Sequence, residues 1–183
     1  MKSKNISKFL SLILRHKPEE LNITLDEYGW ASVDEIIVKM TKRKMPISRA
    51  VLEKIVAEND KQRFTFSDDG TKIRANQGHS IKVNLELKAE TPPQTLYHGT
   101  GAQNEQSILK KGILKSNRQH VHLSADKATA KKVGGRHGKP IIFQIDTYKM
   151  LEDGITFFQS KNEVWLTDYV DPKYISLESK GGL

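Results

Sequence analysis

An arginine and a histidine stand side by side at the end of an apolar segment, Arg15 and His16 in the stretch LILRHKP. A guanidinium offers paired donors in a rigid fork that fits the oxygens of a phosphate. An imidazole, with an ordinary pKa of about 6.5, can move a proton near neutral pH. The pair also has a structural interpretation, because basic residues complement the dipole in a last helical turn and Pro18 disfavours helix just before it. Taken alone, the pair favours the structural interpretation.

Further stretches hold more polar residues and glycines than their surroundings need. They are NDKQRF at 59–64 with IRANQGHS at 73–80, YHGT at 97–100, and HVHLS at 120–124 with Arg118 just before it. His120 and His122 would share one face of a strand, which suggests a pair of metal ligands. Zinc would need at least one further ligand, and the chain has no cysteine and no His-x-x-x-His. We therefore predict no metal site.

Three short helices and a hairpin are predicted to position the first of these stretches. Apolar residues at helical spacing over 6–14 place the Arg-His pair at a helix end. Ser32 with Glu35 predicts a capping box ahead of a second helix, and a third helix is expected from about Ser48. RFTFSDDGTKIRA alternates on both sides of an Asp-Asp-Gly turn, which predicts a hairpin. This order of elements is typical of a winged-helix domain.

The chain becomes polar and charged after Ser80, and Pro92-Pro93 indicates an extended connector. The predicted domains are therefore 1–91 and 92–183. In the second, short strand signals alternate with helices near 105–111 and 125–133, and the strands are TLYH, HVHLS, PIIFQID, EVWLT and KYISLE. This pattern predicts a mostly β core and an α+β fold class for the whole chain.

Composition limits the classes of partner and compartment. The net charge is +8, shared equally by the parts before and after Pro92, and it favours a polyanion such as nucleic acid bound in a cleft shared by both parts. Ordinary solvated lysines are the alternative that composition leaves open. The absence of cysteine excludes disulfides and fits a cytoplasmic protein. No apolar run approaches the roughly 18 residues of a membrane span, so no membrane association is expected.

Seven stretches in this order resemble one family, the RNA 2′-phosphotransferases, known in bacteria as KptA. The stretches are LRHKP, NDKQRF, IRANQGHS, LYHGT, HVHLS, GGRHG and NEVWLT, and they span nearly the whole chain. The resemblance implies an α+β protein with an N-terminal winged-helix-like, RNA-binding lobe. It also implies a C-terminal, mostly β lobe of the ADP-ribosyltransferase type that binds NAD, with the active site between the lobes.

The resemblance further implies an NAD-dependent reaction on RNA that carries an internal 2′-phosphate, as at a tRNA splice junction. The phosphate first attacks the nicotinamide ribose, which releases nicotinamide and leaves a 2′-phospho-ADP-ribosylated RNA. The neighbouring ribose hydroxyl then attacks phosphorus, which frees RNA with a 2′-hydroxyl and ADP-ribose cyclic phosphate. We expect RNA and NAD as partners of a monomeric enzyme.

Catalytic residues follow from the resemblance by motif: Arg15, His16, Arg63 and Arg118. A phosphate monoester is mostly dianionic at neutral pH and is already a nucleophile, so the first step needs positioning rather than a general base. Three arginines can position it and can follow the negative charge that builds at phosphorus in the second step. His16 is suited to move or hold a proton on the attacking hydroxyl or on the leaving RNA oxygen.

NAD-binding residues are implied in the second domain. His98 is expected at the adenosine-side ribose, and the Gly99-Thr100 backbone beside the nicotinamide amide, which a residue without a Cβ would permit. Further candidates are His122 and Ser124 on the nicotinamide-ribose side and Arg136 for the ADP part.

Other residues in these stretches receive structural or peripheral roles. In protein ADP-ribosyltransferases a glutamate stands on a late strand where this family is apolar, and Val164 with its neighbour Glu163 is the matching place here. Neighbours on a strand face opposite ways, so Glu163 cannot substitute if Val164 faces the site. We expect His79 to cap the exit of the hairpin and Arg74 to meet RNA phosphate, and we place Trp30 and Trp165 in the core.

Two alternative functions remain open on the sequence. One is an ADP-ribosyltransferase that caps phosphorylated nucleic-acid ends and stops after the first step. The other is a winged-helix nucleic-acid-binding regulator whose second lobe has no activity. The products formed from NAD and a 2′-phosphorylated RNA distinguish all three.

Overall fold

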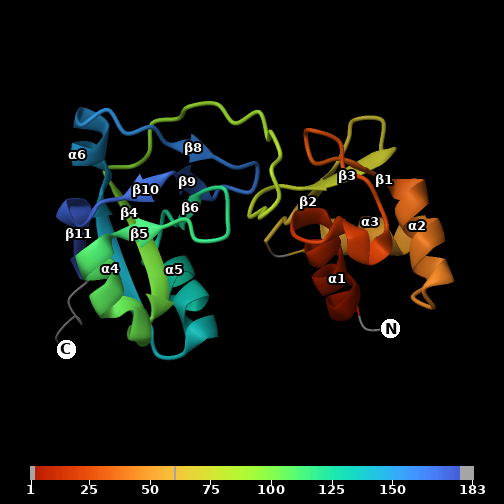
Figure 1. Cartoon of the computed structure of the whole chain (residues 1–183), viewed down its shortest axis with the longest axis horizontal. Coiled ribbons are helices and arrows are strands. Elements are labelled where there is room, and N and C mark those ends of the chain that lie inside the picture. The colour runs from red at the N-terminus through yellow and green to blue at the C-terminus, as the bar shows by residue number, and fades with distance from the viewer. Residues whose placement is uncertain (1–2, 60, 178–183) are drawn as a thin grey trace. The chain divides into compact units, whose positions relative to one another are not determined.

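The computed structural model describes residues 3–59 and 61–177 of the chain. They form two compact units, one that ends at Glu86 and one that begins at Leu87 (Figure 1). Each unit combines helices with antiparallel strands, which confirms the predicted α+β class. Within the described ranges, no helix has both the length and the apolar character needed to cross a membrane.

Helix α1 (Ser3–Arg15) begins the first unit and buries the apolar face that the periodicity predicts. Leu10, Ile13 and Leu14 are fully buried. The helix ends at Arg15, where the backbone N–H groups of His16 and Lys17 both donate to the carbonyl of Leu12 at 2.9 Å. The short 3-10 helix η1 (Pro18–Leu21) follows. His16 therefore lies just outside the helix.

Serine side chains start the next two helices, as predicted. Ser32 Oγ accepts from the N–H of Glu35 at 3.3 Å and caps α2 (Val33–Lys42). Ser48 Oγ caps α3 (Arg49–Ala57) in the same way. The Glu35 carboxylate pairs with Lys39 one turn later, so only the serine half of the predicted capping box is seen.

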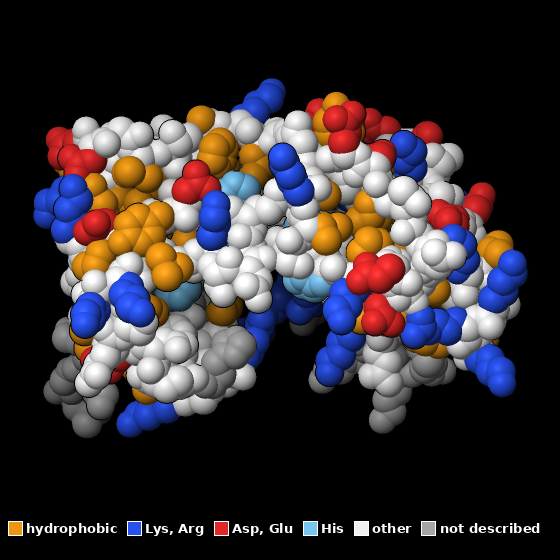
Figure 2. Space-filling view, viewed as in Figure 1, with side chains coloured by type: hydrophobic (Ala, Val, Ile, Leu, Met, Phe, Trp, Pro, Cys, Tyr) orange, Lys and Arg blue, Asp and Glu red, His pale blue; other side chains and the backbone are white. Residues whose placement is uncertain are grey.

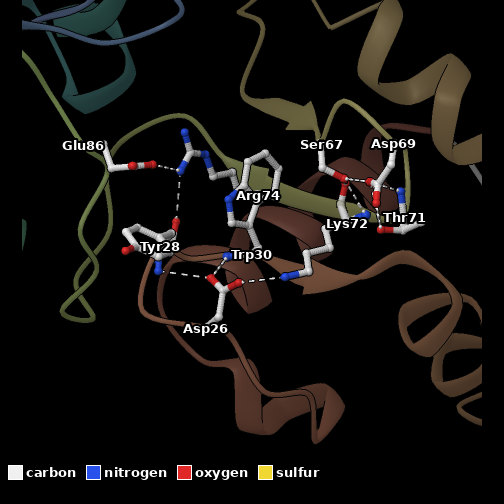
Figure 3. A network of polar contacts seen from close by, with 9 residues as sticks. All are labelled: Asp26, Tyr28, Trp30, Ser67, Asp69, Thr71, Lys72, Arg74 and Glu86. Carbon is white, nitrogen blue, oxygen red and sulfur yellow. Dashed lines mark hydrogen bonds and ion pairs between the residues drawn. The ribbon is translucent and has the colours of Figure 1, made fainter.

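The predicted hairpin forms from β2 (Phe64–Phe66) and β3 (Lys72–Ala75). In its turn, Asp69 Oδ1 accepts from Ser67 Oγ at 2.6 Å and from the N–H of Thr71 at 3.0 Å (Figure 3). The short strand β1 (Ala31–Ser32) pairs with the other edge of β3, which gives an antiparallel sheet in the order β1-β3-β2.

Trp30 departs from its predicted place in the core, because it is only partly buried. The Arg74 guanidinium covers one face of its ring, with Cζ 4.3 Å from the ring centroid (Figure 3). Arg74 Nη1 also donates to the carbonyl of Tyr28 at 3.3 Å and lies 3.9 Å from the Glu86 carboxylate. Arg74 is thus engaged in structural contacts, whereas Trp165 in the second unit is buried as predicted.

The strands of the second unit form antiparallel sheets. The first, in the order β11-β7-β4, consists of β4 (Thr95–Gly101), β7 (Pro140–Asp146) and β11 (Ile175–Leu177). Another, in the order β6-β9-β8, consists of β6 (Val121–Leu123), β8 (Phe158–Gln159) and β9 (Trp165–Thr167). The strands β5 (Ile113–Leu114) and β10 (Tyr169–Val170) form a separate pair. The helices are η2 (Ala102–Asn104), α4 (Glu105–Lys111), α5 (Lys127–Gly134), η3 (Gly135–His137), α6 (Thr147–Glu152) and η4 (Pro172–Tyr174).

The segment predicted as a connector packs within the second unit. Pro92 is buried, and the carbonyl of Pro93 accepts a hydrogen bond from Thr147 Oγ1. The N–H of Glu90 donates to the carbonyl of Phe157 at 2.9 Å. The boundary between the units therefore falls before Leu87, earlier in the chain than the proline pair.

Helix α5 lies directly against β4 because glycines stand where the two backbones meet. A Cβ on Gly99 would lie 1.6 Å from the carbonyl oxygen of Ala130 in α5. A Cβ on Gly134, the last residue of α5, would lie 2.8 Å from the backbone N and O of Thr100. Any larger residue at Gly99 would displace the helix.

Candidate functional site

The Arg15-His16 pair is bound to the segment that leaves the hairpin. The carbonyl of Arg15 accepts from the backbone N–H of Ser80 at 2.9 Å and of Ile81 at 3.4 Å. Ser80 Oγ lies 2.9 Å from Nδ1 of His16. The Arg15 side chain crosses Gly78, since a Cβ at that position would lie 3.8 Å from Nη1. One short segment thus positions both predicted catalytic residues at the end of α1.

Arg63 is held beside Arg15 by a turn that precedes β2. Its Nη1 donates to Asn59 Oδ1 at 3.1 Å, and its carbonyl accepts from the N–H of Asn76 at 2.9 Å and from Arg15 Nη2 at 3.5 Å. Gln62, the residue before it, has a φ of 40°, a value that side-chain-bearing residues rarely adopt. Asn76 Nδ2 donates to the Gln62 carbonyl at 2.5 Å and stabilises this turn. The guanidiniums of Arg15 and Arg63 are therefore mounted in one region of the first unit.

His79 lies beneath this pair and is buried, with 1% of its surface exposed. Neither ring nitrogen has a hydrogen-bond partner among the described residues. Burial, followed by the nearby charges of Arg15 and His16, lowers the pKa of His79 to about 4. The ring is therefore neutral at pH 7. It packs beside the basic residues and makes no hydrogen bond with the described residues, whereas the sequence predicted that it would cap the exit of the hairpin.

Arg118 and His122 form a pair of their own in the second unit. Arg118 is exposed, and its Nη1 lies 2.9 Å from Nδ1 of His122 on β6. A guanidinium can only donate, so Nδ1 of His122 must accept and its ring proton must be on Nε2. The contact fixes the tautomer of His122 and the direction of the Arg118 guanidinium.

His98 on β4 reaches the backbone of β6. Its Nδ1 lies 3.2 Å from the carbonyl oxygen of His122, to which it must donate. Burial lowers the pKa of His98, and the Arg118 charge lowers it further, against the opposing effect of the hydrogen bond. His98 is thus a neutral imidazole with its proton on Nδ1 and a lone pair on Nε2.

The Gly99-Thr100 segment lies at the end of β4, where α5 packs against the strand. The close approach of α5 described above gives a structural reason for glycine at 99. Tyr97 exchanges both backbone hydrogen bonds with Ser124, at 2.8 Å each, so its backbone faces away from β7. By strand alternation the backbone of Gly99 faces the same way and that of Thr100 faces β7. The Thr100 side chain is buried, and its Oγ1 accepts from Asn104 at 2.9 Å.

The remaining predicted NAD-binding residues lie around this strand edge. Ser124 forms the bridge to Tyr97 that connects β6 with β4. Arg136 is exposed in η3, which directly follows the end of α5. Arg118, His98, His122, Gly99 and Ser124 are thus brought together at one edge of the β11-β7-β4 sheet.

Glu163 and Val164 do not lie on a strand, contrary to the prediction. β9 begins at Trp165, and the two residues belong to the turn from β8. The N–H of Glu163 donates to the carbonyl of Ser160 at 2.8 Å, the N–H of Ser160 donates to that of Val164 at 3.0 Å, and Glu163 has a φ of 61°. This is a three-residue hairpin loop with a left-handed residue at its end. The rule of opposite strand faces therefore does not apply to Glu163, whose side chain is exposed.

No group of three or more His, Cys, Asp or Glu residues that could hold a metal ion occurs in the described part of the chain. His120 instead packs against Phe158, with ring centroids 5.9 Å apart.

Three side chains that orient the predicted residues were not identified from sequence: Asn59, Asn76 and Ser80. All three lie within the stretches NDKQRF and IRANQGHS, so the motifs contained the signal. Their roles depend on contacts between segments far apart in the chain, which a motif does not reveal.

Comparison with known proteins identifies the same family as the seven sequence stretches do. The model of the family described as "RNA 2'-phosphotransferase, Tpt1 / KptA family" matches residues 1–169. Proteins named "Probable RNA 2'-phosphotransferase" are similar along their length: that of Fusobacterium nucleatum is 56% identical over 93% of this chain and 96% of its own. That of Trichormus variabilis is 53% identical over 94% of both chains, and that of Escherichia coli is 48% identical over 92% of both. With the Arg-His pair at the end of α1 and the other motifs in their order, the chain belongs to the RNA 2′-phosphotransferase family.

Proposed function

We propose that this protein removes an internal 2′-phosphate from RNA in an NAD-dependent reaction. The products are RNA with a free 2′-hydroxyl, nicotinamide and ADP-ribose cyclic phosphate. Membership of the family supports the 2′-phosphate of RNA as the group transferred. The observation that carries the proposal is the joint mounting of Arg15, His16 and Arg63 on the segments around residues 62 and 80.

The two units then serve as an RNA-binding lobe and an NAD-binding lobe. In the first, three helices followed by the β2–β3 hairpin, with β1 on its edge, support a winged-helix-like lobe. In the second, the antiparallel sheets and the histidines at the edge of β4 support a lobe of the ADP-ribosyltransferase type.

Arginines bind the reacting phosphate. Arg15, Arg63 and Arg118 are the arginines that we propose for this role. Each charge-assisted hydrogen bond is worth about 1.5 to 3 kcal/mol, so several together offset the loss of water around a dianion. Because the dianion is already nucleophilic, the first step requires no base from the protein.

The edge of β4 has the groups that an NAD molecule needs. The backbone N–H and C=O of Gly99 face the side that bears the Tyr97–Ser124 bridge, where they suit a carboxamide. The Nε2 atom of His98 carries a lone pair, whereas the Nε2 atom of His122 carries a hydrogen. Bound NAD supplies the ribose that accepts the phosphate and nicotinamide as the leaving group.

His16 moves the proton in the final step. There the bond between phosphorus and the RNA 2′-oxygen breaks, a bond from phosphorus to the neighbouring ribose oxygen forms, and one proton passes from the attacking hydroxyl to the RNA oxygen. An imidazole can accept and return that proton near neutral pH. The arginines hold the negative charge at phosphorus meanwhile.

One incubation tests the proposal. The full chain is mixed with NAD and a short RNA that carries an internal 2′-phosphate, and all products are followed by mass. We expect nicotinamide, ADP-ribose cyclic phosphate and RNA lighter by one phosphate. A stable ADP-ribosylated RNA would instead indicate a capping enzyme, and RNA binding without nicotinamide release would indicate a binding protein.

A further inference from the structure

We propose that Ser80 is a positioning residue that orients His16 and fixes its tautomer, so that Nε2 is the atom that exchanges a proton with the substrate. The proposal rests on the function proposed above, because it concerns the proton of the final step. In this proposal Ser80 acts through His16 and not directly on the substrate.

Helix α1 does not by itself orient His16. The helix ends at Arg15, and the His16 side chain is exposed. The hydrogen bond of 2.9 Å between Ser80 Oγ and Nδ1 orients the ring. Since this bond engages Nδ1, proton exchange with a substrate falls to Nε2.

Ser80 can do this because its own backbone is fixed on both sides. Its N–H and that of Ile81 donate to the carbonyl of Arg15, one of the acceptors that a helix end leaves without an intrahelical partner. On its other side, His79 is buried. The His79 ring lies close to Gly29, where a Cβ would be 3.6 Å from Nε2. The Ser80 hydroxyl is therefore held on a rigid backbone.

The direction of the hydrogen bond follows from a second acceptor. Ser80 Oγ also lies 3.5 Å from the carbonyl oxygen of Arg15, toward which the hydroxyl hydrogen can point. The oxygen lone pairs then accept from an N–H at Nδ1 of His16. In that tautomer Nε2 carries the lone pair. This form takes the proton from the attacking hydroxyl and returns it to the RNA 2′-oxygen, so no proton is gained or lost over the step.

A purely structural role for Ser80 makes a different prediction. If Ser80 only closed the end of α1, its loss would reduce stability and slow both chemical steps alike. If it orients His16, its loss slows the step that needs a proton transfer and leaves nicotinamide release unchanged. Ser80→Thr keeps the hydroxyl and should restore the behaviour of the natural protein.

The experiment compares Ser80→Ala and Ser80→Thr with Ser32→Ala, a control that removes the serine cap at the start of α2, a helix that does not carry His16. Two quantities are measured on the full chain. The first is the tautomer of His16, from the ¹⁵N shifts of its ring without substrate. The second is the pair of rates for nicotinamide release and for cyclic phosphate release.

We expect the Nδ1–H form of His16 in the natural protein and a mixture of tautomers in Ser80→Ala. In that variant cyclic phosphate release should slow by about tenfold or more, with nicotinamide release within about twofold. Ser80→Thr and Ser32→Ala should match the natural protein in both. An Nε2–H form in the natural protein, or equal slowing of both steps in Ser80→Ala, overturns the proposal. If the tautomer changes as expected but the natural protein releases no nicotinamide, the proposed function fails and the Ser80–His16 contact stands.

Discussion

At the scale of single residues, we expect the contribution of Arg63 to phosphate binding to depend on the shape of its guanidinium as well as on its charge. One guanidinium nitrogen already donates to Asn59, and the fork leaves further donors for an anion. Arg63→Lys should therefore lower kcat/KM by about 10- to 100-fold, the equivalent of one charge-assisted hydrogen bond. The control is Arg43→Lys, a change of an exposed residue that stacks on Phe9. Equal kcat/KM for both variants would show that Arg63 contributes only charge.

His79 makes the stability of the first unit depend on pH. Its pKa is about 4 when folded against an ordinary 6.5, so between these values the unfolded chain binds a proton that the folded chain does not. Stability should be complete above pH 6.5 and should fall by roughly 3 kcal/mol as the pH drops to 4.

The measurement uses urea unfolding followed by the fluorescence of Trp30 in a Trp165→Phe background, because each unit has one tryptophan. His79→Leu removes the titrating ring and the two nitrogens that have no hydrogen-bond partner among the described residues. The free energy of unfolding of this variant should therefore change less between pH 6.5 and 4 than that of the natural protein. The same slope in both proteins would assign the pH dependence to other groups.

At the scale of elements, the contact between α5 and β4 requires glycine at 99. Gly99→Ala places a methyl group against the Ala130 carbonyl, and we expect a loss of about 2 to 4 kcal/mol in the stability of the second unit. Gly135→Ala is the matched control, because nothing lies within 4 Å of its added Cβ and its φ of −62° suits alanine. Unfolding is followed by Trp165 fluorescence in a Trp30→Phe background. If Gly99→Ala left the free energy of unfolding unchanged, α5 would be able to move away from β4 without cost.

In the turn between β8 and β9, Glu163 occupies a backbone position with a left-handed conformation, which favours glycine. Glycine adopts this conformation without the steric cost that a Cβ brings, so Glu163→Gly should stabilise the second unit by about 0.5 to 1 kcal/mol. Glu163→Ala keeps the Cβ and should bring no gain. If both substitutions raise the midpoint of unfolding equally, the gain comes from the lost charge.

Local rules predicted the elements that depend on local interactions. The serines that begin α2 and α3, the Asp-Asp-Gly hairpin and the helix at 105–111 were all found, because caps, turns and helical periodicity depend on residues a few positions apart. Glu163 escaped prediction because nothing in its type favours a left-handed turn. The structural role of Gly99 was not predicted either, because the residue that it packs against, Ala130, lies on a different element.

The sequence supplied candidate residues for the site but not the contacts that hold them in place. The motifs supplied Arg15, His16 and Arg63, whereas the contacts of Asn59, Asn76 and Ser80 depend on how the first unit closes. The two units divide before Leu87 and not at the proline pair for a related reason. The proline pair signals an extended chain, but only packing shows that Pro92 is buried in the second unit.

At the scale of the molecule, both units carry basic side chains. Figure 2 shows Lys and Arg side chains over both units, with Asp and Glu among them. With a net charge of +8, RNA binding should weaken as salt rises. For single-stranded RNA the slope of log affinity against log salt should be about −0.7 for each phosphate neutralised. Titrations of a 2′-phosphorylated RNA at several salt concentrations measure this, and a flat response would exclude a binding mode based on phosphate charges.

The hydrogen bond between His16 and Ser80 joins residues 64 positions apart, and Ser80 lies close to the end of the first unit at Glu86. A ribosome must therefore have released nearly all of that unit before the imidazole acquires its partner. An incomplete or locally opened chain could keep its first helix intact and still leave the imidazole without its orienting contact. Catalytic competence is thus a late and sensitive reporter of whether the unit has closed.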